Sequence, residues 1–269
     1  MSRDETTGFE ALTTFVEAHL DFATSHYNDS YLDRRFSSRL RRTRSDDYEE
    51  YLDLVREDSD EQEALLDALS INVTGFFRNP DVWEGIRSVL RTLSDEQERI
   101  HVWSAACADG REPYSLAMLA LDDPRTAGDK LSVLATDISD PALETAREGL
   151  YESTRTIDIG DQLTFLSNYH RYIDQSGDQF TVRDPVREMV SFENHDLIND
   201  GAKSGFDLVV CRNLFIYIDN GYKEEMLETI SESLRPGGYL VIGKAETIPP
   251  NLKSDFTILD GRMRIYQRE

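Results

Sequence analysis

Hydrophobic residues in the first part of the chain recur at steps of three and four. Four such stretches follow one another, over residues 9–23, 32–40, 48–55 and 65–69. This spacing gathers apolar side chains on one side of a helix, and no alternating strand pattern interrupts it. The pattern predicts a small bundle of short helices.

From Ile100 onward, short apolar runs alternate with helical stretches. The expected strands are 100–105, 131–136, 189–192, 206–210 and 239–243, and the expected helices between them are 113–121, 141–149 and 222–234. Two last apolar runs, 256–259 and 263–266, flank Asp260-Gly261 and predict a hairpin. This alternation predicts an α/β fold with a largely parallel sheet and helices on both faces.

The segment 157–187 interrupts the alternation of strands and helices. It holds two alternating runs on either side of Ser176-Gly177-Asp178, which predict a β-hairpin inserted into the sheet domain. We therefore expect two domains, a helical one over 1–72 and a sheet domain over 73–269 that contains this insert.

The composition is strongly acidic. The 269 residues include 52 acidic and 29 basic ones, which gives a formal net charge of −23. Such a surface repels itself unless salt screens it, so we expect a salt-loving host, a halophilic archaeon. The same charge opposes nonspecific binding of nucleic acid, because phosphate contacts need a positive surface.

Signals for export, membrane insertion or metal binding are missing from the sequence. No run approaches the ~20 apolar residues of a membrane span, and the first residues are polar and acidic. Cys107 and Cys211 have no metal-ligand spacing and are expected to be reduced, buried thiols. We expect a cytoplasmic protein with no direct membrane insertion and no metal.

Candidate chemistry is sought where strands end, because a doubly wound sheet binds its ligand at the carboxyl ends of its central strands. The turn 105–110 is rich in small residues but lacks the G-x-G-x-x-G fingerprint of dinucleotide enzymes. Glu112 at the following helix start would repel a phosphate, yet it can accept hydrogen bonds from an amine or face a sulfonium cation. Alternatively, Glu112 only favours the helix dipole.

Two further strand ends carry polar residues. Asp137 follows the second strand, where a carboxylate typically binds ribose hydroxyls, although it could also be the N-cap of the next helix. Arg212 and Asn213 leave a buried strand beside three large apolar residues. A polar pair in that position indicates that something is bound there.

Four ordered motifs then resemble those of CheR methyltransferases. The segment 72–78 resembles the N-x-T-x-F-F-R signature, WSAACADGREPYSLAM the cofactor loop, LATDIS the ribose-binding motif and VVCRNLFIYID the C-R-N-x-x-I-Y-F-D motif. LRPGGYLVIGKAETI resembles the closing strand of that family, and the match runs from about Leu32 to the C-terminus. The chain thus resembles CheR-type chemotaxis receptor glutamate O-methyltransferases.

The resemblance implies a Rossmann-like class I S-adenosylmethionine-dependent methyltransferase sheet with a small N-terminal helical domain and an inserted β-hairpin subdomain. It implies methylation of glutamate side chains on the cytoplasmic methylation helices of methyl-accepting chemotaxis receptors, with S-adenosyl-L-methionine as the cofactor. Separately, we expect a monomer. The residues that it assigns to the cofactor pocket are Asn72, Thr74, Arg78, Glu112, Asp137, Asp196, Leu197, Arg212 and Asn213.

The sequence departs from the family pattern at two places. Asp196 stands where the family usually has Asn, so an amide donor near the adenine is lost. Asp109-Gly110-Arg111 stands where the family more often shows Thr-Gly-Glu, and we expect Arg111 to point to solvent.

Methyl transfer to a carboxylate needs no general base, because a glutamate of pKa ~4.3 is already ionised near neutrality. The enzyme then has to position the reacting groups, for which Arg78 and Tyr217 are the candidate catalytic donors, meeting Asp137 at one cavity. The alternatives are an Arg78 salt bridge at the domain junction and a Tyr217 that packs the sheet edge.

An arginine-rich helix stands out in this acidic chain. Arg35, Arg39 and Arg42 share one face of the helix 30–44, beside an apolar stripe that can pack while the arginines stay free. In the family a basic helix faces the receptor, which suits these three arginines. Alternatively, the helix is solvated and only compensates nearby acid.

Other functions remain open from the sequence. The substrate could be another protein or a small carboxylate, or the chain could be a non-catalytic cofactor-binding signalling module. An RNA methyltransferase is disfavoured by the acidic field and by the lack of an Asn-Pro-Pro-Tyr type motif.

Overall fold

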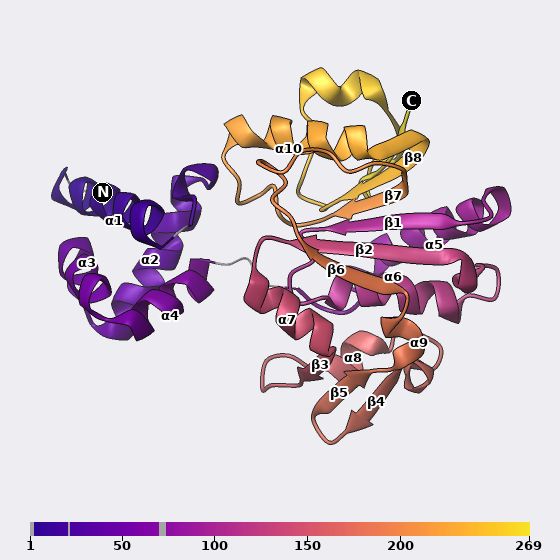
Figure 1. Ribbon diagram of the computed structural model, residues 1–269, viewed down its shortest axis with the longest axis horizontal. Coiled ribbons are helices and arrows are strands. Elements are labelled where there is room, and N and C mark those ends of the chain that lie inside the picture. The colour runs from indigo at the N-terminus through magenta and orange to yellow at the C-terminus, as the bar shows by residue number, and fades with distance from the viewer. Residues whose placement is uncertain (1–2, 21, 70–73) are drawn as a thin grey trace. The chain divides into compact units, whose positions relative to one another are not determined.

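The computed structural model describes residues 3–20, 22–69 and 74–269. The chain divides into two compact units (Figure 1). One unit comprises Met1–Ile71 with Tyr217–Lys223, and the other comprises Asn72–Ile216 with Glu224–Glu269.

The first unit is a bundle of helices. Its elements are α1 (Arg3–His19), the short 3-10 helix η1 (Thr24–His26), α2 (Asp29–Thr43), α3 (Tyr48–Glu57) and α4 (Ser59–Leu69). The side chain of Asn28 caps α2 and that of Asp47 caps α3, each accepting a backbone N–H of the first turn. The predicted apolar stripes form its core, including Leu12, Val16, Phe36, Tyr51, Val55 and Leu65. The helical bundle predicted from the spacing is confirmed.

A segment far along the chain belongs to this helical unit. In Tyr217–Lys223, the backbone oxygen of Tyr217 accepts the N–H of Asn28 at 3.0 Å, and Asp219 donates its N–H to the oxygen of His26 at 2.9 Å. These bonds form a short antiparallel bridge next to the start of α2. The expected sheet domain, 73–269, had included this segment.

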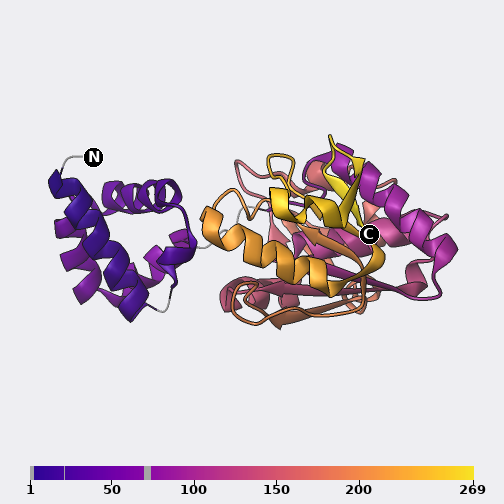
Figure 2. The same ribbon diagram turned by 90° about the horizontal axis from the view of Figure 1, so that it is seen from above.

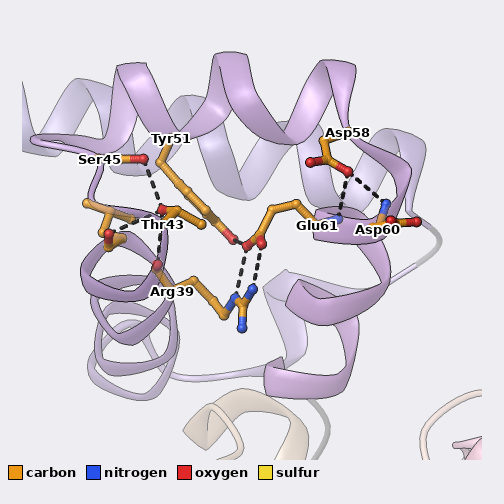
Figure 3. A network of polar contacts seen from close by, with 8 residues as sticks. Arg39, Thr43, Ser45, Tyr51, Asp58, Asp60 and Glu61 are labelled. Carbon is orange, nitrogen blue, oxygen red and sulfur yellow. Dashed lines mark hydrogen bonds and ion pairs between the residues drawn. The ribbon is translucent and has the colours of Figure 1, made fainter.

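A buried ion pair, together with a tyrosine hydroxyl, links three of the helices (Figure 3). Glu61 on α4 is 8% exposed, and its carboxylate accepts bonds from Arg39 Nε at 2.9 Å, from Arg39 Nη2 at 2.5 Å and from the Tyr51 hydroxyl at 2.5 Å. Burial raises the pKa of Tyr51, which therefore stays a donor. A buried carboxylate needs such partners, so Arg39 is not free on an exposed face of α2, and that expectation was wrong.

The second unit is built on a seven-stranded sheet. Its strands run in the order β6-β2-β1-β7-β8-β10-β9, where the first five are parallel and β10 is antiparallel to both of its neighbours. The strands are β1 (Ile100–Ala105), β2 (Leu131–Asp137), β6 (Val190–Asn194), β7 (Phe206–Cys211), β8 (Leu234–Ile242), β9 (Phe256–Asp260) and β10 (Ile265–Arg268). The predicted α/β fold and the terminal hairpin are confirmed.

Helices cover the sheet. They are α5 (Pro80–Glu96), α6 (Arg111–Asp122), α7 (Asp140–Glu148) and α10 (Asn220–Ser233), with the 3-10 helices η2 (Gly128–Lys130) and η4 (Pro250–Asp255). Val102, Val210 and Val241 share one core with residues of α5 and α6, which lie behind the strands in Figure 1. Figure 2 shows α10 and η4 nearest the viewer.

Within the described residues, no helix combines the length and apolar character needed to cross a bilayer.

The insert is a small antiparallel sheet in the order β3-β5-β4. It comprises β3 (Leu150–Glu152), α8 (Ile159–Leu163), the 3-10 helix η3 (Tyr169–Arg171), β4 (Ile173–Ser176), β5 (Gln179–Val182) and α9 (Asp184–Arg187). The hairpin predicted around Ser176-Gly177-Asp178 is present as β4 and β5. The remaining strand of this sheet, β3, lies before residue 157, the expected start of the insert, and pairs with β5.

The Arg39–Glu61 pair should be critical for the stability of the helical unit. We expect Arg39→Ala to lower the free energy of unfolding by about 3 kcal/mol, because it leaves a buried carboxylate with only Tyr51 as partner. Arg42→Ala, an exposed site on the same helix, is the matched control and should change little. Urea unfolding followed by circular dichroism measures both, and equal effects of the two variants would contradict the structural role.

Candidate functional site

Left-handed backbone conformations concentrate at the carboxyl edge of the sheet. Of the seven non-glycine residues with positive φ in the described part of the chain, five lie in the three segments that bear the predicted site. They are Phe77, Asn79, Ala106, Ala108 and Asn213. Such conformations persist only where surrounding contacts impose them, and they are typical of functional sites.

The turn after β1 is held by Asp137 at the end of β2. Asp137 Oδ2 accepts the backbone N–H of Ala108 at 2.8 Å, and its Oδ1 accepts that of Ser139 at 3.0 Å. Gly110 closes the turn at φ +88°, and a Cβ there would lie 2.7 Å from that of Ala146, so only glycine is accommodated. Burial raises the pKa of Asp137. Ser139 is the N-cap of α7, so the N-cap alternative for Asp137 does not hold.

Glu112 is a buried carboxylate in the first turn of α6. Its Oε1 accepts the Ser104 hydroxyl at 3.0 Å, and its Oε2 lies 3.5 Å from Arg212 Nη1. Burial raises the pKa of Glu112 to about 7, although the positive charges of Arg212 and Arg78 oppose the shift. The side chain therefore has charged partners within the site and does more than complement the helix dipole.

Arg212 connects segments that are far apart in the sequence. From the end of β7, its Nη2 donates to the backbone oxygen of Arg78 at 2.9 Å and to Asn79 Oδ1 at 3.0 Å. The guanidinium also lies 5.7 Å from the centre of the Trp83 ring. Arg212 is 7% exposed, and the lost hydration lowers its pKa. The predicted residues Arg78, Glu112 and Arg212 are thus brought together.

One member of this cluster, Glu246, was not anticipated from the sequence. It follows β8 and is 3% exposed, and its Oε2 accepts the backbone N–H of Asn213 at 3.1 Å. The motif KAETI that contains it was attributed only to the closing strand. A charged residue just past the end of a buried strand was the available signal.

Two buried polar atoms of the cluster have no hydrogen-bond partner among the described residues. They are Arg212 Nε, a donor, and Glu246 Oε1, an acceptor. Buried polar groups are rarely left unpaired, so the cluster has capacity for a ligand that both accepts and donates. With Arg78 and Glu112 nearby, two cations and two carboxylates converge, which suits a ligand bearing an ammonium and a carboxylate.

Arg111 does not point to solvent as expected. Its Nη2 lies 2.6 Å from Asp109 Oδ2, and the guanidinium lies 5.8 Å from the centre of the Tyr151 ring. The side chain is 11% exposed. Tyr151, which donates to the backbone oxygen of Asp109 at 2.7 Å, completes an enclosure for the arginine that the local sequence could not indicate. The substitution in this loop therefore adds an internal ion pair.

The remaining cofactor candidates lie in different surroundings. Asp196 accepts the backbone N–H of Ile198 at 2.8 Å and the side-chain amide of Asn199 at 2.7 Å, so its carboxylate organises its own loop. Leu197 is buried and Thr74 is half-buried. Asn72 lies outside the described residues. The pocket roles of these residues stay predictions.

Tyr217 and the arginines of α2 belong to the helical unit. The centre of the Tyr217 ring lies 4.9 Å from the centre of the Tyr31 ring. The Arg35 guanidinium lies 5.0 Å from the centre of the same Tyr31 ring. Arg35 is half-buried, whereas Arg42 is exposed. The catalytic role of Tyr217 stays a prediction, as does the receptor role of the arginines.

A separate pocket of about 380 Å³ opens at the opposite edge of the sheet. It is lined by residues at the amino ends of β1, β2, β6 and β7, among them His101, Ser132, Ser191 and Phe206. None of the predicted site residues lines it, so it does not belong to the site at the carboxyl edge.

Family comparisons agree with this geometry. Residues 72–265 match the model described as CheR methyltransferase, SAM binding domain, and residues 7–70 match CheR methyltransferase, all-alpha domain. The sheet and the match to its SAM-binding domain define an S-adenosyl-L-methionine-dependent methyltransferase. The chain belongs to the CheR methyltransferase family.

Several curated relatives share most of this chain. The chemotaxis protein methyltransferase of Listeria monocytogenes is 33% identical over 239 residues, which cover 88% of each chain. Chemotaxis protein methyltransferase 1 of Pseudomonas aeruginosa is 34% identical over 196 residues, which cover 70% of each chain. The match to the Listeria protein is long enough to include part of the helical unit as well as the sheet.

The raised pKa of Glu112 predicts a pH-dependent contribution to stability. A carboxylate whose pKa rises from 4.5 to about 7 on folding stabilises the protein below pH 4.5, and this contribution is lost as the pH rises through about 7. We expect the free energy of unfolding of the wild type to fall by roughly 3 kcal/mol relative to Glu112→Gln across that interval. Denaturant titrations at several pH values measure the difference, and parallel curves for the two proteins would refute the assignment.

Proposed function

We propose that this methyltransferase moves the methyl group of S-adenosyl-L-methionine to glutamate side chains of methyl-accepting chemotaxis receptors. The products are glutamate methyl esters and S-adenosyl-homocysteine. The observation that carries the proposal is the cluster of Arg78, Arg212 and Glu112 at the carboxyl edge of the sheet, in a chain whose relatives are named chemotaxis protein methyltransferases.

The charges of the cluster match the ends of the cofactor. Arg212 and Arg78 would bind the carboxylate of the cofactor's methionine part, while Glu112 would accept hydrogen bonds from its ammonium group. Asp137 has one hydrogen bond on each oxygen and keeps lone pairs for ribose hydroxyls. When bound, S-adenosyl-L-methionine supplies a methyl group made electrophilic by the sulfonium. The protein then has to bind the cofactor, orient its methyl group toward the acceptor and exclude water from the site.

The acceptor glutamate arrives ionised, because its ordinary pKa of ~4.3 lies well below neutrality. We assign to Arg78 and Tyr217 the task of holding this carboxylate in line with the methyl carbon. A fixed arginine keeps the charge in place while water is excluded, which compensates for desolvation. No side chain has to remove a proton, so catalysis rests on positioning.

Receptor recognition is assigned to the exposed arginines of α2. Arg42 is exposed, as are Arg34 and Arg41, and these side chains can reach an acidic partner. Arg35 is half-buried beside Tyr31 and would contribute at the border of that surface. Arg39 is occupied by Glu61, so we assign it to the fold.

The working environment forms part of the proposal. We infer a salt-loving archaeal host from the net charge of −23. The proposal also includes action in the cytoplasm, as a monomer. A small carboxylate as substrate would leave the exposed arginines of α2 without a role, and a non-catalytic cofactor-binding module would leave the positioning roles of Arg78 and Tyr217 without one. Neither rival is favoured by a specific contact.

The reaction can be tested with labelled S-adenosyl-L-methionine and receptor cytoplasmic domains. We expect base-labile methyl ester on helix glutamates, with Arg78→Ala lowering kcat about 100-fold and Tyr217→Phe about tenfold, since both lose a positioning donor. Calorimetry with S-adenosyl-homocysteine separates lost binding from lost transfer. Wild-type turnover in both variants would remove them from the mechanism, and absence of ester with every receptor fragment would sink the proposed function.

The receptor surface can be tested by charge reversal. We expect Arg42→Glu to raise KM for the receptor domain about fivefold with kcat unchanged, and the effect to shrink as salt is added. Arg262→Glu, an exposed arginine in the terminal hairpin, is the matched control and should leave KM unchanged. Equal effects of the two reversals would show that net charge, and not α2, governs recognition.

A further inference from the structure

Glu246 is the most buried carboxylate of the site, and the reaction as proposed gives it no role. It lies four residues beyond the end of β8, and its backbone N–H donates to the oxygen of Gly243 at 2.9 Å. This turn directs the side chain back toward the carboxyl end of β7. A residue 3% exposed that keeps a carboxyl group must be compensated by donors.

Its donors are backbone groups of two separate turns. Glu246 Oε2 accepts the N–H of Gly243 at 2.5 Å and the N–H of Asn213 at 3.1 Å. Asn213 has φ +65°, a left-handed conformation that asparagine tolerates better than other non-glycine residues and that neighbouring contacts can fix. An anion that binds the N–H of Asn213 stabilises the turn in this conformation.

Gly243 leaves space for this contact and for little else. A Cβ at position 243 would lie 2.5 Å from Glu246 Oε2 and 2.8 Å from the backbone nitrogen of Asn213. Both distances are far below ordinary contact, so any side chain at this position would displace the carboxylate or the turn. The glycine and the glutamate therefore act as one unit.

The turn that Glu246 holds carries Arg212. Arg212 directly precedes Asn213, and its guanidinium reaches Glu112 and the backbone oxygen of Arg78. A small rotation at Asn213 would move the guanidinium away from these partners. The negative charge of Glu246 also favours the charged form of Arg212, whose unpaired Nε is buried.

We propose that Glu246 is a positioning residue, which fixes the Arg212–Asn213 turn through the backbone N–H groups of Asn213 and Gly243 so that Arg212 can bind the cofactor. The inference rests on the assignment of Arg212 to the cofactor in the proposed function. It adds a residue whose Oε2 acts on Arg212 through the backbone, whereas its Oε1 is the acceptor that the cluster leaves open to a ligand.

The test compares three variants of the full chain. Glu246→Gln keeps the volume but removes the charge, and Gly243→Ala displaces the carboxylate without changing it. Asp207→Asn is the matched control, because Asp207 is 3% exposed and accepts the N–H of His101 at 2.8 Å at the opposite end of β7. Each variant is assayed for Tm, for S-adenosyl-homocysteine affinity by calorimetry and for KM of the receptor domain.

We expect Glu246→Gln and Gly243→Ala to weaken S-adenosyl-homocysteine binding about tenfold or more, with KM for the receptor unchanged. Asp207→Asn should lower Tm comparably but bind S-adenosyl-homocysteine within about twofold of the wild type. A rescue of binding at high cofactor concentration, with kcat restored, would support positioning.

Binding within twofold of the wild type by both site variants, with only Tm lowered, would overturn the inference and leave Glu246 a structural residue. If Glu246→Gln does not fold, Gly243→Ala decides by the same criterion. A wild type that binds S-adenosyl-homocysteine but methylates no receptor would sink the proposed function alone. A wild type that does not bind it would overturn both.

Discussion

The site depends on the pairing of one buried cation, Arg212. A guanidinium 7% exposed cannot stay charged without partners, and it finds them on two segments other than its own. Glu112 from α6 supplies a carboxylate, and the turn before α5 supplies the backbone oxygen of Arg78. The left-handed conformations on these segments are supported by such contacts. Contacts within the protein therefore hold these segments together at the carboxyl edge of the sheet.

A similar constraint operates in the helical unit, with a different result. The carboxylate of Glu61 accepts three bonds from Arg39 and Tyr51, so this network is internally complete. The cluster at the sheet edge is incomplete, since Arg212 Nε and Glu246 Oε1 have no partner among the described residues. A complete network stabilises helix packing, whereas an incomplete one retains capacity for a ligand. This difference separates a structural ion pair from a binding site made of the same residue types.

The sequence predicted what repeats locally and failed where a partner is distant. Strands β1 and β7 are mainly apolar, and their bounds differ little from those expected. The strand β3 has three residues and is defined only by pairing with β5, almost thirty positions later. A helical wheel places Arg39 on the same face as Arg42, because it considers the residues of a single helix. It cannot include Glu61, the partner of Arg39 on α4. Arg111 was misplaced for the same reason, since its enclosure depends on Tyr151.

The segment that starts at Tyr217 also pairs with a distant part of the chain, and this pairing changes how its motif is interpreted. The motif VVCRNLFIYID is continuous in sequence, yet its last part exchanges backbone hydrogen bonds with His26 and Asn28 at the start of α2. Tyr217, whose ring contacts Tyr31, lies four positions after Asn213, whose turn Glu246 holds. The same Tyr31 ring carries the Arg35 guanidinium on the arginine-rich helix. The conformation of Tyr217 therefore depends on the helical unit, because the backbone bonds that fix its segment are made there. The helical unit therefore includes the end of a motif whose first part lies in the sheet unit.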